Sequence, residues 1–442
     1  MKSPFSLFFL SIWLAAAAMP GLAQTTVGTW SKAALLPVVQ SEWDGAAIGD
    51  FFYAVGGEMK RTPQNDETKA SDELWIYDAA ANKWTQGPNM PGSRNHPAVT
   101  AWDGKLYVFG GYDWPCCKNY PWPYGSNNAW QYDPATKAWK TLAPIPRRFG
   151  AGMAAAFDGR IYVMAGTDSG QFHSVSDVHE YDPVANTWRA RAPMKNAREH
   201  VKGAVVDSLI YVIGGHSKPG ASKVNQGSIE AYSPKSDKWY DKGSLPTPRG
   251  GIGVSYLGGK IYVFGGEGAD FTLFSRVDQF DPATGQWNKV NDYPAGGIHG
   301  MATITYKGTA HLIAGNNPAG FNAKNYHEVF TPPEVAGCTQ PGASNYNRYA
   351  TKDDGSCQGV ALRPRGGAEG MRLTLAGDRL RLEGLPSGSY RVSLLDAGGR
   401  ALAGESFEGM GADLPARIGT GARFLRLEGP SGAAVRILPI AP

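Results

Sequence analysis

The sequence predicts an all-β protein, in which a six-bladed β-propeller closed by the N-terminal strand is followed by a small C-terminal β-sandwich. Three observations lead to this prediction. A pattern of about fifty residues recurs along most of the chain, the Trp that its last copy lacks stands near the N-terminus, and the final part alternates apolar and polar residues. Short β-rich repeats of this length are typical of propellers.

Each copy of the repeat begins with an apolar strand that ends in two small residues. An aromatic residue follows, usually with an acidic neighbour that Ser233 replaces in the fourth copy, and a Trp comes seven residues after the aromatic one. The five complete copies carry the pairs Gly56-Gly57, Gly110-Gly111, Ala165-Gly166, Gly214-Gly215 and Gly265-Gly266, and close with Trp84, Trp139, Trp188, Trp239 and Trp287. Glycine permits crowded backbones, and the aromatic residues fill the space between twisted sheets, so each blade depends on its neighbours.

The sixth copy shows how the ring closes. It has the pair Ala314-Gly315 and Phe330 but no Trp, because the chain continues into Thr331-Pro332-Pro333. Trp30 precedes the first glycine pair and has no strands of its own. We therefore predict that the N-terminal strand is the outer strand of the sixth blade and lies beside Phe330. Neither chain end then leaves a free sheet edge in the propeller.

Over residues 24–333 this repeat resembles the kelch family of propellers. In kelch propellers with known ligands, the binding face is formed by the turn that approaches each innermost strand and by the residue after each small pair. The resemblance implies a binding face in this chain made of Trp43, Arg94, His96, Arg148, Phe149, Arg198, His200, Arg249 and His299 in the approach turns, with Glu58, Tyr112, His216, Glu267 and Asn316 after the pairs. Glu42 and Thr167 occupy equivalent positions.

The composition of this face predicts its ligand. Arg, His, Glu and aromatic side chains together fit a polar ligand of the anionic or glycan type, bound by Arg and stacked on Trp43 or Phe149. Approach-turn arginines also hydrogen-bond carbonyl groups of adjacent loops, and this alternative stays open for each of them. No nucleophile, metal motif or fixed acid–base pair stands out in the sequence, which favours a binding protein over an enzyme. A glycan, a peptide or a small molecule is the expected partner.

The resemblance also implies an alternative function. Exported bacterial kelch propellers resemble sialic-acid mutarotases and copper-dependent, galactose-oxidase-like enzymes. The oxidases need a Tyr crosslinked to Cys, and the only propeller cysteines are the adjacent Cys116 and Cys117, so an oxidase is not expected. A mutarotase-like enzyme or a lyase would use His216 as acid or base with Glu58 or Glu267 opposite it.

A metal site is the other use for this face. His96, His200 and His299 would approach the axis with rough threefold symmetry, and three imidazoles bind Zn²⁺ or Cu²⁺. His299, however, is offset by one residue from the other two. We therefore expect no metal and no cofactor, and interpret the three histidines as a polar lining.

The N-terminus has the features of a signal peptide. Residues 1–23 contain Lys2, an apolar run up to Ala18 and small residues before Gln24. The run is short for a membrane span, although a retained anchor is the alternative. We therefore expect a protein that is secreted or held at the cell surface.

Four cysteines in an exported chain are expected to form disulfides. Cys338 and Cys357 bracket a polar segment in a linker module of residues 334–362. Cys116 and Cys117 would form a strained ring between neighbours. Two free thiols or a metal-binding pair are the alternatives for this second pair.

Residues 363–442 form the last predicted domain. Their short alternating segments indicate a small antiparallel β-sandwich. Residues 385–392 and 396–400 are similar to the C-terminal sorting domains of the type IX secretion system, which makes the secretion machinery a partner. An ordinary accessory β-domain is the alternative. The formal net charge of +4 with scattered Lys and Arg does not indicate a nucleic-acid surface, and the sequence leaves the oligomeric state open.

Overall fold

The computed structural model describes residues 28–62, 65–113, 125–168, 173–217, 223–317, 322–341 and 343–358, together with eight strands of the C-terminal part. The predicted signal peptide, Cys116 and Cys117 lie outside the described residues. Within these ranges every regular element is a strand, and none of the described segments is a helix long and apolar enough to cross a membrane.

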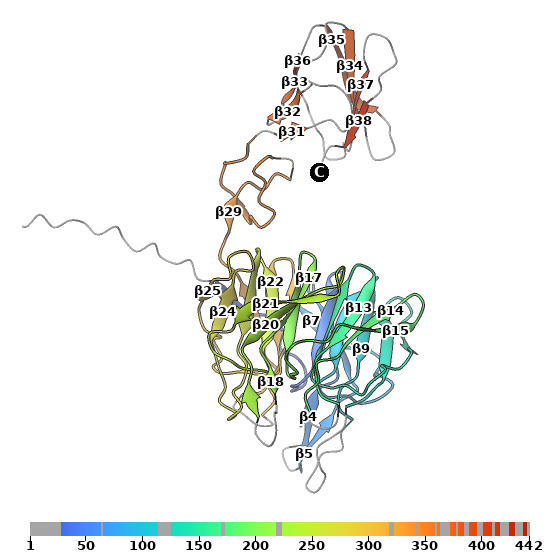
Figure 1. Cartoon of the computed structure of the whole chain (residues 1–442), viewed down its shortest axis with the longest axis vertical. Coiled ribbons are helices and arrows are strands. Elements are labelled where there is room, and N and C mark those ends of the chain that lie inside the picture. The colour runs from blue at the N-terminus through green and yellow to red at the C-terminus, as the bar shows by residue number, and fades with distance from the viewer. Residues whose placement is uncertain are drawn as a thin grey trace, which may run out of the picture.

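Six four-stranded antiparallel sheets form the propeller (Figure 1). From the innermost strand outward, blade 1 contains β2 (Asp44–Ile48), β3 (Phe51–Val55), β6 (Leu74–Asp78) and β7 (Lys83–Gln86), and blade 2 contains β8 (Ala98–Trp102), β9 (Lys105–Phe109), β10 (Ala129–Asp133) and β11 (Ala138–Thr141). Blade 3 contains β12 (Met153–Phe157), β13 (Arg160–Met164), β14 (Val178–Asp182) and β15 (Thr187–Arg191), and blade 4 contains β16 (Lys202–Val206), β17 (Leu209–Ile213), β20 (Ser228–Ser233) and β21 (Lys238–Ser244). Blade 5 contains β22 (Gly253–Leu257), β23 (Lys260–Phe264), β24 (Val277–Phe280) and β25 (Trp287–Lys289), and blade 6 contains β26 (Ala302–Tyr306), β27 (Thr309–Ile313), β28 (His327–Thr331) and β1 (Thr29–Lys32).

The N-terminal strand closes the ring as predicted. Strand β1 pairs antiparallel with β28, and Trp30 lies directly opposite Phe330. The Trp30 ring lies 5.0 Å from that of Phe330 and 5.2 Å from that of Tyr293, measured between ring centroids. The predicted fold class, a six-bladed propeller whose last blade takes its outer strand from the N-terminus, is confirmed.

The repeated aromatic residues join consecutive blades through hydrogen bonds as well as packing. Trp84 donates its indole N–H to the Ala34 carbonyl at 2.9 Å, and Trp139, Trp188 and Trp239 make the equivalent bond at 2.8 to 2.9 Å. In blade 1 the Tyr77 hydroxyl donates to Asn82, which also accepts the Ala34 N–H. The repeat motif therefore stabilises the boundary between blades.

The small-residue pairs allow the close approach on which the axial face depends. In all six pairs both residues have positive φ, near +54° to +70° at the first position and +88° to +105° at the second. Ala165 and Ala314 occupy the first position in two blades. At the second, always glycine, a Cβ would lie 2.5 to 2.8 Å from a backbone carbonyl oxygen of the approach turn, so a side chain there would push the two segments apart.

The loops after the pairs and the chain end lie at opposite ends of the propeller. Small hairpins in these loops, β4 (Glu58–Thr62) with β5 (Asn65–Ala70) and β18 (His216–Ser217) with β19 (Val224–Asn225), project at the lower end in Figure 1, whereas β29 leaves from the upper end. We call the end that carries β4, β5 and β18 the loop end.

The segment after the propeller forms a small disulfide-bonded module. Strand β29 (Ala336–Gly337) pairs with β30 (Lys352–Asp353), and Cys338 forms the predicted disulfide with Cys357. The module contacts the propeller where the Tyr256 hydroxyl donates to that of Tyr349 at 2.8 Å.

The C-terminal part consists of two four-stranded antiparallel sheets, as the sequence predicts for a β-sandwich. One contains β31 (Val360–Leu362), β32 (Arg372–Ala376), β33 (Arg379–Glu383) and β36 (Ala412–Pro415), and the other contains β35 (Ala401–Glu408), β34 (Ser389–Leu395), β37 (Phe424–Glu428) and β38 (Arg436–Pro439).

Candidate functional site

A closed ring of main-chain hydrogen bonds surrounds the propeller axis. Each blade contributes the residue that lies two positions before its innermost strand, and each backbone N–H donates to the carbonyl of the ring residue in the preceding blade at 2.7 to 3.1 Å. The ring residues are Glu42, His96, Ala151, His200, Gly251 and Gly300. All six have positive φ, between +51° and +65°. The backbone therefore fixes six equivalent side-chain positions around one axis.

A second layer brings the two predicted sets of site residues together. In every blade the residue before the ring position forms a backbone bridge with the residue after the small pair. The bridges are Ser41 with Glu58, Asn95 with Tyr112, Gly150 with Thr167, Glu199 with His216, Gly250 with Glu267, and His299 with Asn316. The approach turns and the residues after the pairs thus share one face, as the kelch resemblance implies.

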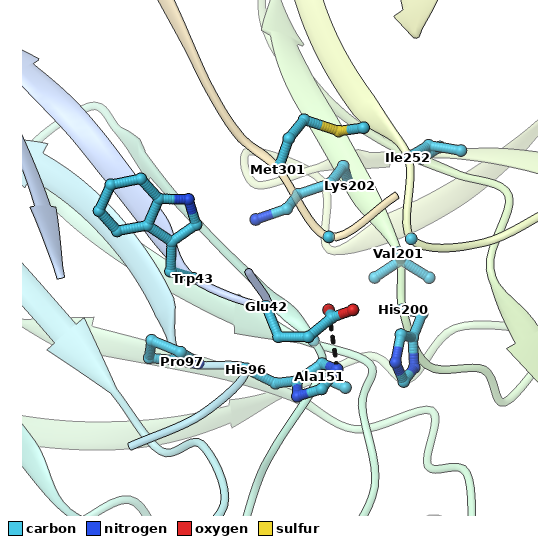
Figure 2. A pocket seen from close by; sticks show the side chains of 13 residues that line it. Glu42, Trp43, His96, Pro97, Ala151, His200, Val201, Lys202, Ile252 and Met301 are labelled. Atoms are coloured by element: carbon cyan, nitrogen blue, oxygen red, sulfur yellow. Dashed lines mark ion pairs between the residues drawn. The ribbon is translucent and has the colours of Figure 1, made fainter. Parts of the chain in front are cut away.

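Acidic and imidazole side chains meet on this axis. We call Glu42, His96, Glu199, His200, His216, Lys223, Glu267 and His299 the axial cluster. Glu42 lies between two histidines, with Oε2 at 2.9 Å from His96 Nε2 and Oε1 at 3.1 Å from His299 Nδ1. Figure 2 shows its carboxylate pointing toward His96 and His200, two ring residues that are separated by Ala151.

Glu267 is the second centre of the axial cluster. Its carboxylate lies 2.9 Å from Lys223 Nζ and 3.5 Å from both His216 Nε2 and His299 Nδ1. Carboxylates and imidazoles at ion-pair distance therefore run without a break from Glu42 through His299 and Glu267 to His216.

Burial and neighbouring charges shift the pKa values of the axial cluster in different directions. Burial lowers the pKa of the His200 imidazole well below its usual value, and it also lowers the pKa of His216. Burial alone would lower the pKa of His299, but the Glu42 and Glu267 carboxylates raise it above its usual value. Burial acts to raise the pKa of Glu42, yet His96 and His299 hold it well below its usual range. Burial and the carboxylates therefore shift the pKa values of neighbouring imidazoles in opposite directions.

A small cavity lies against the ring on the axis. Its walls are the ring residues and the residues that follow them, among them Trp43, Val201 and Met301 (Figure 2). Its volume is about 40 Å³, which is enough for a few water molecules. Lys202 also lines it and pairs with Asp44 at 2.7 Å.

Three of the four predicted arginines are buried in their own blades. Arg198 is 0 % exposed and bonds Glu230 at 3.1 Å and the Val212 carbonyl at 3.1 Å. Arg249, also 0 % exposed, donates to the Gly265 carbonyl at 2.6 Å and to Asp278 at 2.9 Å.

Arg94 donates to Asn128 at 2.6 Å and stacks over Trp130, whereas Arg148 is exposed. For the three buried arginines the structure favours the alternative, in which approach-turn arginines bond groups of the scaffold and do not form a fork for an anion.

The aromatic candidates are buried as well. Trp43 donates its indole N–H to the Ile313 carbonyl at 3.0 Å, and Phe149 packs in the core between blades 2 and 3. Neither ring is exposed for stacking with a ligand. Tyr112 bonds the Thr167 hydroxyl at 2.6 Å, and burial raises its pKa.

The last two predicted residues, Glu58 and Asn316, lie in the second layer and are buried. Asn95 donates to Glu58 at 3.4 Å, and Asn316 exchanges backbone hydrogen bonds with His299.

Sequence reasoning placed Glu42 in an approach turn, but it did not select three other residues that the structure places in or beside the axial cluster, namely Glu199, Lys223 and Phe271. Aligning the copies places Glu199 directly before His200, at the position that His299 holds in the sixth copy. Lys223 and Phe271 lie in loops with no equivalent between blades. Phe271 is 59 % exposed, has a φ of +65°, and lies 5.5 Å from Lys223 Nζ, measured to its ring centroid.

The blades, the ring and the axial cluster define a β-propeller with a polar axial site. Family models match it: the KLHDC2/KLHL20/DRC7 Kelch-repeats domain over residues 28–215, and the Kelch motif over residues 197–246 and 248–292. The chain contains kelch repeats, and its propeller is of the kelch type. Kelch domains generally mediate interactions with proteins or ligands.

Similar proteins include Kelch-like protein terF of Aspergillus terreus, 26 % identical over 69 % of this chain and 56 % of that protein. Human Kelch-like protein 35 is 33 % identical over 58 % of this chain and 40 % of that protein. The chain thus spans about half the length of the curated relatives it matches. The solved structure of YjhT matches 68 % of this chain and 97 % of its own, with a TM-score of 0.56 and 17 % identity, which shows the fold alone.

Proposed function

We propose that this protein is an exported kelch propeller that binds a polar, glycan-type ligand at the loop end of its axis. The observation that carries the proposal is the exposed Phe271 ring beside Lys223, whose ammonium group contacts Glu267 of the axial cluster at 2.9 Å. An apolar ring at the edge of a polar cluster suits a sugar, whose ring has an apolar face and a hydroxyl-bearing rim.

The conformation of the Phe271 loop supports this role. A bulky residue rarely adopts a positive φ, and such backbone conformations concentrate at ligand sites. Here the turn is held by the Phe271 N–H to the Gly268 carbonyl at 2.9 Å, and by Asp270, which accepts the Thr272 N–H at 3.1 Å. The loop therefore holds an exposed aromatic ring in a defined position.

The charges of the axial cluster favour hydroxyl groups over a strongly anionic ligand. Carboxylates accept hydrogen bonds from sugar hydroxyls, and imidazoles both donate and accept them. Arg94, Arg198 and Arg249 bond groups of their own blades, and Lys223 is paired with Glu267. We therefore expect the site to prefer a neutral or weakly acidic saccharide to a polyanion.

Export and surface location belong to the same proposal. They are supported by the signal-peptide pattern of residues 1–23, by the Cys338–Cys357 disulfide, and by the similarity of residues 385–400 to type IX sorting domains. The expected partners are a saccharide at the loop end and the secretion machinery at the C-terminal domain. Fractionation of the source cells, with detection of the protein outside the cytoplasm, tests this part.

Calorimetric titration of the full mature chain with neutral monosaccharides, sugar acids and polysaccharides tests the ligand. We expect saturable binding of at least one member of the panel, weakened about fivefold by Phe271→Ala, because the stacking of one aromatic ring contributes about 1 kcal/mol. Phe51→Ala is the matched control, because Phe51 is also exposed (41 %) but begins strand β3, outside the axial cluster. Equal affinity of Phe271→Ala and wild type, or no binding across the panel, would refute the proposal.

A carbohydrate-active enzyme, mutarotase-like or a lyase, is the second candidate. The specific observation in its favour is the contact of Glu267 with both His216 and His299 at 3.5 Å, because a carboxylate that holds two imidazoles can orient an acid and a base on one substrate. Turnover of sugar acids followed by NMR tests it. Loss of turnover in His216→Ala with binding retained would favour the enzyme, whereas binding without any product in wild type would favour the binding protein.

A further inference from the structure

We propose that Glu42, His96 and His200 bind a divalent transition-metal ion on the propeller axis. Each of the three offers one ligand atom, and these atoms lie within 4.8 Å of one another. They come from three different blades and from equivalent positions of the backbone ring. The three residues belong to the axial cluster, but the proposal rests on their own geometry and not on Phe271 or Lys223, so it stands whether or not a saccharide binds.

The neighbours of the two histidines support a metal. His96 Nδ1 contacts Asn95 Oδ1, and His200 Nδ1 contacts Glu199 Oε2. Histidines that bind a metal commonly donate their other ring N–H to such an oxygen, which fixes the tautomer and the ring orientation. In both residues this arrangement leaves Nε2 as the atom that faces the metal position.

The third ligand is held in the same way. Glu42 Oε1 lies 3.1 Å from His299 Nδ1, and Glu42 Oε2 lies 2.9 Å from His96 Nε2. One oxygen is thus oriented by a protein partner while the other faces the imidazole that would share the ion. His299, which sequence reasoning considered together with His96 and His200, is offset by one residue, so Gly300 takes the ring position and His299 contacts the Glu42 carboxylate.

Donor chemistry indicates the class of ion. Two imidazole nitrogens and one carboxylate oxygen suit Zn²⁺ and its first-row neighbours, whereas Mg²⁺ and Ca²⁺ prefer oxygen ligands throughout. Three protein ligands leave at least one coordination position open. The ring residues also line the axial cavity of about 40 Å³, which has room for a metal-bound water.

The surrounding charge is compatible with a cation. Glu199 adds a second carboxylate to that of Glu42, Lys223 is paired with Glu267 at 2.9 Å, and Lys202, which lines the cavity, is paired with Asp44 at 2.7 Å. Because the ring is held by main-chain groups, it positions the three side chains before an ion arrives, and such preorganisation favours binding.

Metal titration of the full, tag-free chain without any saccharide tests the proposal. After dialysis against a chelator, we expect Zn²⁺ to bind with a stoichiometry of about one, and Co²⁺ to give the visible absorption of a site with mixed nitrogen and oxygen ligands. His200→Ala and Glu42→Gln should weaken Zn²⁺ at least about 100-fold, and Glu199→Gln, which alters only the neighbour of a ligand, about tenfold or more. His173→Ala, a histidine outside the ring with a 62 % exposed side chain, is the matched control and should bind as wild type.

Two results would overturn the metal site: no stoichiometric Zn²⁺ or Co²⁺ in the wild type, or equal affinity in wild type and His200→Ala. The Co²⁺ spectrum distinguishes a changed site from a misfolded variant. A shifted spectrum in Glu199→Gln can arise only if the variant still folds and binds the ion. Phe271→Ala should keep its zinc, so failure of the saccharide proposal and failure of the metal proposal give different results.

Discussion

The His311–His327 pair of blade 6 should make the stability of the propeller depend on pH. The two rings are buried between blades 6 and 1, where His311 Nδ1 lies 2.9 Å from His327 Nε2 and the rings contact Phe52, Tyr77 and Trp84. Burial lowers the pKa of His311 to about 4, and burial together with His311 lowers the pKa of His327 to about 3. Both are therefore neutral in the folded protein at neutral pH.

The size of the effect follows from the difference in protonation between the folded and unfolded states. In the unfolded chain both histidines titrate near 6.5. Above that pH neither state binds protons there and no penalty exists. As the pH falls from about 6.5 toward the pKa values of the folded state, the two histidines are protonated in the unfolded state but not in the folded state. The free energy of unfolding therefore falls. At about pH 5 each histidine lowers the free energy of unfolding by about 2 kcal/mol, and the pair lowers it by about 4 kcal/mol.

Urea unfolding of wild type and of the double variant His311→Tyr, His327→Val at about pH 8 and pH 5 measures this contribution. The substitutions are those of blade 3, which has Tyr162 and Val178 at the equivalent positions. We expect the wild type to lose about 4 kcal/mol more than the variant between the two pH values. The axial histidines are common to both proteins, so their contribution cancels. Equal losses in both proteins would refute the reasoning.

Three further predictions concern the scaffold. Arg198→Met should lower the free energy of unfolding by about 3 kcal/mol or more, because Glu230 would keep a buried charge without its cation, whereas Arg148→Met, at an exposed position, should change it little; equal effects would contradict the buried role. Trp30→Ala should lower it by about 3 kcal/mol through lost packing on Phe330 and Tyr293, with exposed Tyr240→Ala as the control in thermal unfolding. Cys338→Ser should speed proteolysis between residues 338 and 357, because the disulfide restricts the unfolded state by about 3 kcal/mol, and should leave unfolding of the propeller unchanged; unchanged proteolysis would contradict this.

The fold was predictable because the chain contains six copies of one repeat, which can be compared with one another. Copies that share a glycine pair and a Trp at fixed spacing indicate blades, and the misplaced Trp30 indicates how they close. These signals come from interactions that every blade must make with its neighbour, so they recur.

The site was predictable only in part, for two physical reasons. Counting back from each small pair found the approach turns, yet it could not say which way a side chain points. Arg198 and His200 are two residues apart, but the first points into its blade and the second lies at the ring position. Lys223 and Phe271 lie in loops that differ between blades, so no internal comparison identifies them.

Because the ring is formed by main-chain groups, the side chains at its six positions can be exchanged. Its bonds use only amide and carbonyl groups, and its six positions already hold Glu, His, Ala and Gly. Substitution of Ala151 by Asn or Asp, which tolerate a positive φ, would place a new functional group on the axis and leave the main-chain hydrogen bonds of the ring in place. Evolution or protein engineering can therefore change the side chains on the axis one ring position at a time.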